Sequence, residues 1–255
     1  MVELSIIIPA YNEENRIRET VESYINYFKN YSHELIIIPN GCKDKTEDIV
    51  KELSKKYLSI KYKTIKEAVG KGKAIKEGFN IAQGSLIGFV DADNSTKPKD
   101  FEDLIKNIKG YDCIIASRYM KGSIVKPKQK IMRIIGSRAF NFLVRIMLNL
   151  EICDTQCGAK LFKKNAIKNI TPKLDVTRWA FDVDLLLKLK NQGYNIKEFP
   201  TTWEDKAGSK FSLNKAILEM FLALTRLRLI NSKFKFIVSI YDSLPESIKI
   251  YHKIR

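Results

Sequence analysis

The chain has 255 residues, 45% of them apolar, and a formal net charge of +16 at pH 7. This is enough apolar material for one sizeable α/β domain with an appendage. No apolar stretch approaches the roughly 20 residues that cross a bilayer, so we expect no membrane-spanning helix. The charge favours a polyanionic partner, and composition does not choose between a nucleic acid, an anionic membrane surface and a phosphorylated substrate.

The N-terminus and the cysteines indicate where the protein works. Glu3 stands where a signal peptide has basic residues, and Pro9 breaks the first apolar run, so we expect a strand there and no signal peptide. The cysteines lack the spacing of zinc ligands, and reduced thiols in a cytosolic protein are expected. They are Cys42, Cys113, Cys153 and Cys157.

Short apolar runs alternate with amphipathic helices over the first 117 residues. Strands are expected at 4–8, 35–38, 60–64, 86–90 and 113–116, with helices at 17–28, from 44, at 72–82 and from 98. Because parallel neighbours need crossover connections, this order predicts a Rossmann-like α/β fold, with a mostly parallel central sheet and helices on both faces.

The pattern changes in the second half. A long amphipathic helix is expected at 129–150, which can lie on lipid or pack on the sheet. A turn-rich stretch at 154–162 follows, then a helix at 181–192 and a strand at 196–199. We divide the chain into a main domain, 1–212, and a basic amphipathic helical extension, 213–255. The extension either contacts lipid headgroups or packs on the domain with a solvated basic face.

Polar segments leave the predicted strands at one edge of the sheet. Asp91 and Asp93 end a buried strand, and their spacing aims both carboxylates at the edge where open α/β sheets bind ligands. Paired carboxylates suit a hard divalent cation that bridges phosphates, although a solvated turn is the alternative. The segments 9–13, 39–41 and 70–73 converge there, and the last brings glycine amides and lysines to phosphate. The Walker pattern is absent, which disfavours a nucleotide triphosphatase.

Seven segments resemble a known family: IIPAYNEE at 7–14, DAD at 91–93, SRY at 117–119, DTQCG at 154–158, RWAFDV at 178–183, WE at 203–204 and GSK at 208–210. The first three resemble family 2 glycosyltransferases of the GT-A fold. The others resemble, more narrowly, the dolichyl-phosphate β-glucosyltransferases. The resemblance runs from about residue 4 to 212.

This resemblance implies transfer of a hexose, with inversion, from a nucleotide sugar to dolichyl or polyprenyl phosphate. UDP-glucose is the favoured donor, UDP-N-acetylglucosamine stays open, and a GDP-mannose-dependent mannosyltransferase is the alternative. It also implies roles for residues. Asp91 and Asp93 would hold Mg²⁺ or Mn²⁺, and Asp93, Arg118, Arg133, Lys210 and Asp154 would form the catalytic set. The donor site would comprise Pro9, Ala10, Tyr11, Glu13, Asn40, Lys71, Gly72, Asp91, Ala92 and Asp93.

The proposed chemistry needs cations rather than a base. A lipid monophosphate carries about −1.5 to −2 charge near neutral pH, so it attacks without deprotonation. Its repulsion from the donor diphosphate must be screened by arginines and a cation. Asp154 and Asp182 could each orient an arginine, contact sugar hydroxyls or cap a turn. Asn40 stands where relatives have an aspartate, which leaves base recognition open.

Two functions other than glycosyl transfer remain as alternatives. A nucleic-acid-binding protein is disfavoured because the basic residues are dispersed among acids and no recognition motif is present, so we expect no nucleic acid partner. A non-catalytic scaffold with the same fold is the other. For an enzyme of this kind we expect peripheral attachment to an anionic membrane surface, on its cytoplasmic face.

Overall fold

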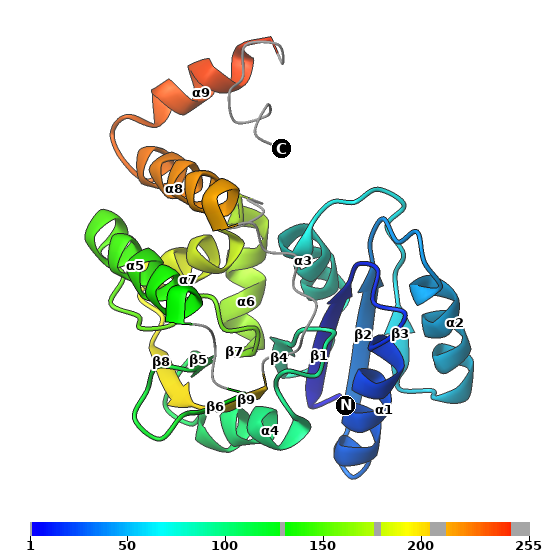
Figure 1. Cartoon of the computed structure of the whole chain (residues 1–255). Helices are drawn as coiled ribbons and strands as arrows, with labels where there is room; N and C mark the ends of the chain where they lie inside the picture. The colour runs from blue at the N-terminus through cyan, green and yellow to red at the C-terminus, as the bar shows by residue number, and fades with distance from the viewer. Residues whose placement is uncertain (1, 128–130, 176–179, 205–212, 246–255) are drawn as a thin grey trace.

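The structure is a computed structural model that describes residues 2–127, 131–175, 180–204 and 213–245 (Figure 1). Its centre is a seven-stranded sheet with the order β3-β2-β1-β4-β7-β5-β8. The strands are β1 (Leu4–Ala10), β2 (His33–Pro39), β3 (Ile60–Tyr62), β4 (Leu86–Phe89), β5 (Cys113–Ser117), β7 (Lys160–Lys163) and β8 (Ile196–Pro200). All neighbouring pairs are parallel except those that β7 makes with β4 and β5.

Helices cover both faces of this sheet, as the alternation of elements predicts (Figure 1). One face packs against α1 (Ile17–Phe28), α2 (Thr46–Lys56) and α4 (Pro98–Asn107). The other packs against α3 (Lys71–Ile81), α5 (Ile131–Leu148), α6 (Lys164–Ile170), α7 (Phe181–Asn191) and α8 (Leu213–Ile230). A 3₁₀ turn (Thr171–Lys173) follows α6, and α9 (Lys235–Ser243) follows α8.

The central strands are apolar on both sides because each face has its own core. Ile6 and Ile8 of β1 lie in the core under α1, whereas Ile7 between them lies in the core under α3. Each of these side chains is fully buried. A strand covered on both faces therefore appears as a continuous apolar run rather than an alternating one.

The expected α/β fold is confirmed, but the interpretation of 154–162 as turns is wrong at its end. Lys160 begins β7, which inserts antiparallel between β4 and β5 and makes the sheet mixed. This strand has four residues with lysines at both ends, so its sequence carries little apolar signal. Two further short strands, β6 (Ile124–Lys126) and β9 (Thr202–Glu204), pair in parallel as a separate two-stranded sheet.

The helices α5 and α8 are packed against the core of the main domain. Phe140, Val144 and Leu148 of α5 lie in the same core as Ala223 and Leu227 of α8, so both helices pack on the main domain. The division at residue 212 remains a prediction. In the part of the chain that the structure describes, no helix is both long and apolar enough to cross a membrane.

Candidate active site

The predicted carboxylate pair lies directly after β4, near the middle of the sheet. The Oδ1 atom of Asp91 is 2.5 Å from the Nζ atom of Lys71, the first residue of α3. Oδ1 of Asp93 accepts a hydrogen bond from the Ser95 N–H at 3.0 Å. Both aspartates are partly exposed, while Ala92 between them is 5% exposed and faces the core. Two carboxylates thus remain accessible on this loop, and Ala92 anchors it.

A glycine makes room for Asp91. A Cβ atom placed on Gly158, two residues before β7, would lie 1.9 Å from Oδ2 of Asp91. Real Cβ atoms do not approach so closely, so the carboxylate occupies the space that any other residue at position 158 would fill. The tight approach of β7 to β4 therefore sets the position of this carboxylate.

Opposite charges surround the pair. Burial raises the pKa of Asp91, but the Lys71 ammonium, followed by Lys160 and Arg118, lowers it below its usual range. Burial lowers the pKa of Lys71, and Asp91 together with Asp182 raises it above its usual value. Asp91 is therefore a carboxylate and Lys71 an ammonium at neutral pH.

Lys160 is a buried cation that sequence reasoning missed. It is fully buried in β7, where its Nζ donates to Oδ1 of Asp182 at 2.5 Å and to the carbonyl of Cys157 at 2.6 Å. The same Nζ lies 5.2 Å from the ring centroid of Phe89. Asp182 therefore anchors a lysine rather than an arginine. A lysine after the apolar run Cys157-Gly158-Ala159 is the signal that could have indicated it.

Asp154 orients Arg118, one of the alternatives that the sequence left open. Its two oxygens accept hydrogen bonds from Nε and Nη2 of Arg118 at 2.8 and 2.9 Å, and Oδ2 also accepts the Arg118 N–H. Burial raises the pKa of Asp154, but Arg118 lowers it to a net decrease. Glu198 on β8 accepts hydrogen bonds from the backbone N–H groups of Cys153 and Asp154, which fixes the loop.

Aromatic rings gather the arginines. The guanidinium carbons of Arg118 and Arg133 lie 5.2 and 5.9 Å from the ring of Trp203. Those of Arg118 and Arg138 lie 5.6 and 5.2 Å from the ring of Tyr119. We call Arg118, Arg133 and Arg138 the arginine cluster. The cluster brings two arginines of α5 next to the arginine that follows β5. Its charge reaches the carboxylate pair, because Arg118 lowers the pKa of Asp91.

In the strand order, β1 and β2 lie on one side of β4, which leads into Asp91 and Asp93, and β5, which leads into Arg118, lies on the other. Tyr11 is 51% exposed, whereas Pro9 and Ala10 are buried inside β1. Glu13 pairs with Arg16 at 2.7 Å. Burial raises the pKa of Glu13 despite this arginine, and the negative charges of the two aspartates add to the increase.

Asn40, at the end of β2, donates its side-chain N–H to the carbonyl of Ala10 at 3.0 Å. Its Oδ1 is buried, and no partner for it is found among the described residues. Gly72 of the glycine-lysine loop is buried under Phe181, whose side chain a Cβ at Gly72 would meet at 2.6 Å. Gly72 therefore shapes the packing of α3, and only its backbone can face a ligand.

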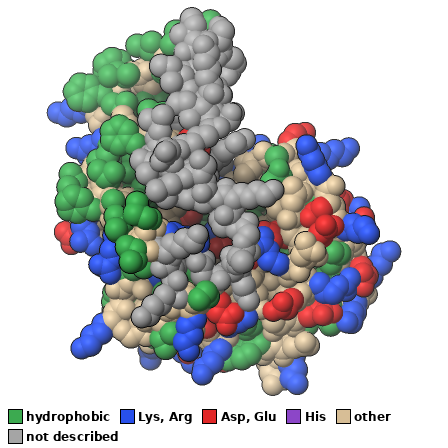
Figure 2. All heavy atoms as spheres, in the orientation of Figure 1, with side chains coloured by type: hydrophobic (Ala, Val, Ile, Leu, Met, Phe, Trp, Pro, Cys, Tyr) green, Lys and Arg blue, Asp and Glu red, His purple; other side chains and the backbone are tan. Residues whose placement is uncertain are grey.

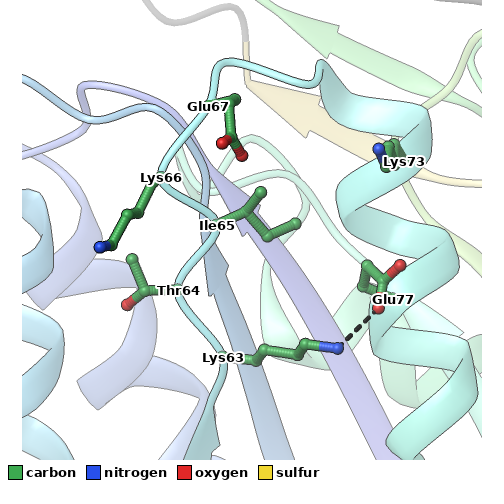
Figure 3. A pocket seen from close by; sticks show the side chains of 7 residues that line it. All are labelled: Lys63, Thr64, Ile65, Lys66, Glu67, Lys73 and Glu77. Carbon is green, nitrogen blue, oxygen red and sulfur yellow. Dashed lines mark hydrogen bonds and ion pairs between the residues drawn. The ribbon is translucent and has the colours of Figure 1, made fainter.

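A hollow of about 320 Å³ lies beside these loops, between α3 and the segment that leads into it (Figure 3). It is lined by Lys63, Thr64, Ile65, Lys66, Glu67, Lys73 and Glu77. None of the predicted site residues lines it. It borders the Asn40 side of the site, because the N–H of Ile65 donates to the carbonyl of Pro39 at 2.8 Å.

Several expectations are not tested by these contacts. Lys210 and the segment Arg178-Trp179 lie outside the described residues. Within the described ranges, no group of three or more His, Cys, Asp or Glu residues could hold a metal ion, so the third metal ligand stays unidentified.

The family model described as Glycosyl transferase family 2 matches residues 5–171 of this chain. Glycosyltransferase AglD of Haloferax volcanii is 32% identical over 225 residues, which cover 86% of this chain and 36% of AglD. The chain therefore spans about a third of the length of AglD. The dolichyl-phosphate beta-glucosyltransferase of Dictyostelium discoideum is 32% identical over 254 residues, covering 93% of this chain and 76% of that protein.

Solved structures confirm the GT-A fold. Glucosyl-3-phosphoglycerate synthase from Mycobacterium tuberculosis, crystallised with Mn²⁺, uridine diphosphate and phosphoglyceric acid, superposes with a TM-score of 0.60 at 15% identity. The match covers 87% of this chain and 78% of that structure. At this identity the likeness establishes the fold alone.

Proposed function

This chain belongs to glycosyl transferase family 2, and from that premise we propose that it transfers a hexose, with inversion, from a nucleotide sugar to dolichyl or polyprenyl phosphate. UDP-glucose is the proposed donor. The observation that carries the proposal is that the arginine cluster lies at the end of β5, on one side of the β4 carboxylates, and the loops after β1 and β2 lie on the other.

The donor side has groups suited to a nucleoside diphosphate. The exposed ring of Tyr11 can stack on a base, and the buried Oδ1 of Asn40, which has no partner among the residues that the structure describes, suits a base N–H. Lys71 lies at the N-terminus of α3, where backbone N–H groups and an ammonium favour phosphate. Uracil and guanine both carry a ring N–H and a stacking face, so these features support a nucleoside diphosphate and the transfer assay decides the base.

The carboxylates fit a hard divalent cation. Mg²⁺ is usually bound through one or two carboxylates together with substrate phosphates, so Asp91 and Asp93 suffice if the donor diphosphate and water complete the shell. When bound, such a cation neutralises the diphosphate and stabilises it as a leaving group. Mg²⁺ and Mn²⁺ both suit these oxygen donors.

The acceptor side combines cations with exposed apolar surface. Arg133 lies on the first turn of α5, where Ile131, Met132 and Ile135 are 73, 62 and 54% exposed. A lipid phosphate needs this combination, since its head is a dianion and its tail is apolar. We place the phosphate at the arginine cluster, where bidentate guanidinium hydrogen bonds would hold it.

The attack then needs no general base. The phosphate oxygen is already charged, and the arginine cluster would lower its repulsion from the donor diphosphate. Asp154 holds Arg118 through two hydrogen bonds, so that guanidinium is oriented before the substrate arrives. His33 lies in β2 with its Nδ1 near the Tyr31 carbonyl, away from this chemistry.

The exposed apolar side of the same region supports attachment to a membrane surface. Ile131, Ile135, Phe142 and Ile146 form a stripe along α5, and each is more than half exposed. Phe234, Phe236 and Ile240 are exposed in and next to α9, beside Lys233 and Lys235. Figure 2 shows hydrophobic side chains on the side of the molecule where these helices lie, with Lys and Arg among them. Attachment of the protein to the cytoplasmic face of the membrane remains a prediction.

The test is a transfer assay with purified protein, Mg²⁺ and dolichyl phosphate in vesicles. Labelled UDP-glucose, UDP-N-acetylglucosamine and GDP-mannose are compared, and the lipid extract is analysed. We expect a lipid-phosphate glucose, formed at least tenfold faster than the other products. Transfer from GDP-mannose alone would show that the donor is GDP-mannose and not UDP-glucose. The absence of transfer from all three donors would refute the proposal.

A matched pair of variants tests the acceptor site. Arg133→Gln should raise the KM for dolichyl phosphate about tenfold or more, by loss of a charge-assisted hydrogen bond. Arg145→Gln is the control, because Arg145 is exposed on the same helix but lies beside Cys153. Equal effects of the two substitutions would show that general surface charge, rather than the arginine cluster, binds the lipid.

A further inference from the structure

Lys71 lies where a divalent cation would also bind. Its Nζ is 2.5 Å from Oδ1 of Asp91, one of the two carboxylates assigned to the cation above. A divalent cation on this carboxylate would lie within a few ångström of the ammonium, and the two positive charges would repel each other. Metal binding should therefore weaken the Lys71–Asp91 ion pair and favour movement of the lysine.

We propose that Lys71 is the counter-ion of Asp91 before ligands bind, and that its ammonium moves from Asp91 to the donor diphosphate when the metal binds. This inference rests on the proposed function and goes beyond it. It makes metal binding and nucleotide binding interdependent, so that the cation enters well only together with the diphosphate.

The charges around the site support this exchange. Asp91, Asp93, Asp154 and Asp182 supply four carboxylates, against the three cations Lys71, Lys160 and Arg118. The site is thus close to neutral before any ligand arrives. A divalent cation added alone would face an ammonium that has lost its partner. A diphosphate brings the negative charge that receives both cations.

The local structure allows Lys71 to move while its backbone stays fixed. Gly72, the next residue, is buried against Phe181, which holds the start of α3 in place. The Lys71 side chain is 34% exposed, and its Nζ atom lies 5.7 Å from the ring centroid of Phe89. A lysine has a flexible four-carbon stem, so its ammonium can shift by several ångström without backbone movement.

Lys160 provides the contrast within the same cluster. Its ammonium is fully buried and held by Asp182, the Cys157 carbonyl and the Phe89 ring. Moving it would leave Asp182 unpaired in the core, which is strongly unfavourable. Lys160 is thus a fixed cation and Lys71 a movable one.

The test measures Mn²⁺ binding to the purified full chain by electron paramagnetic resonance, with and without UDP, corrected for the Mn²⁺–UDP complex in solution. In the wild type we expect UDP to tighten Mn²⁺ binding on the order of 10- to 100-fold, the usual range of coupling between two sites. Lys71→Met should tighten nucleotide-free Mn²⁺ binding about tenfold and reduce the coupling to a few-fold.

Two further variants complete the design. Lys55→Met is the control, because Lys55 is exposed in the last turn of α2, belongs to none of the site segments and should leave both affinities unchanged. Lys71→Arg keeps the charge and should keep nucleotide-free Mn²⁺ binding weak. Thermal unfolding shows whether each variant is folded. Unchanged or weaker nucleotide-free Mn²⁺ binding by Lys71→Met, or the same tightening in Lys55→Met, would overturn the proposal.

This experiment uses no lipid and no turnover, so it fails separately from the proposed function. Coupled binding without transfer to dolichyl phosphate would count against the acceptor alone. Transfer to dolichyl phosphate with Mn²⁺ affinities that Lys71→Met does not change would count against the role of Lys71 alone.

Discussion

Gly158→Ala should displace the Asp91 carboxylate without changing any charge. The added Cβ would lie 1.9 Å from Oδ2 and 2.5 Å from Cγ of Asp91. The carboxylate must retreat by about 1.5 Å to restore ordinary van der Waals contact. Such a shift moves the carboxylate from its position beside Lys71 and displaces one of the two proposed metal ligands.

The magnitude follows from this displacement. Misplacing a catalytic group by about 1 Å can cost on the order of 100-fold in rate, or about 2.7 kcal/mol of transition-state stabilisation. Overpacking a buried position costs a further 1 to 3 kcal/mol or so of folding free energy. We therefore expect hexose transfer by Gly158→Ala to fall about 100-fold and Mn²⁺ binding to weaken, while the protein stays folded.

A double-mutant cycle isolates the cause. All three atoms nearest to the added Cβ belong to the Asp91 carboxyl group, so Asp91→Ala removes the clash. Urea unfolding, Mn²⁺ binding and transfer rates are compared for wild type, each single variant and the double variant. In the Asp91→Ala background, Gly158→Ala should change none of these quantities much. Equal effects of Gly158→Ala in both backgrounds, or near-normal transfer by the single variant, would refute this reasoning.

Two further predictions concern buried carboxylates. Asp154→Ala leaves the 9% exposed Arg118 side chain without its partner, so the free energy of unfolding in urea should fall by about 3 to 5 kcal/mol. Hexose transfer should slow more than tenfold. An unchanged unfolding midpoint would contradict this prediction. Burial raises the pKa of Asp184 to about 6, against the lowering effect of Lys188. The folded protein holds this proton more tightly than the unfolded chain does. The free energy of unfolding should therefore fall by up to roughly 3 kcal/mol as the pH rises from about 4 to 6. Asp184→Asn should lack this fall in urea unfolding at pH 4 and 7, and parallel pH curves would disprove the assignment.

Much of the fold could be predicted from local pattern. The alternating strands and helices of the first half follow from runs such as Ile6-Ile7-Ile8, and the carboxylate pair follows from its place after an apolar strand. The sequence also indicated the amphipathic character of α5. These features depend on residues close together in the chain, where side-chain spacing alone sets which face is apolar.

The parts that were missed depend on contacts between distant segments. β7 is too short and too rich in lysine to be predicted as a strand, and it is stable because β4 and β5 pair with both of its edges. The charge of Lys160 is acceptable in the core only because Asp182 comes to it from α7. No local pattern could assign that lysine to the interior.

The sequence by itself determined which chemistry is available to this protein: two carboxylates after a buried strand, a lysine on a glycine loop, and arginines beyond them. The tertiary structure decided how those groups are paired. Asp154 selects Arg118 from 36 positions away, Trp203 draws Arg118 and Arg133 together, and the missing side chain of Gly158 gives Asp91 its place beside Lys71. Charge and shape act through space, so only the folded chain sets which opposite charges meet.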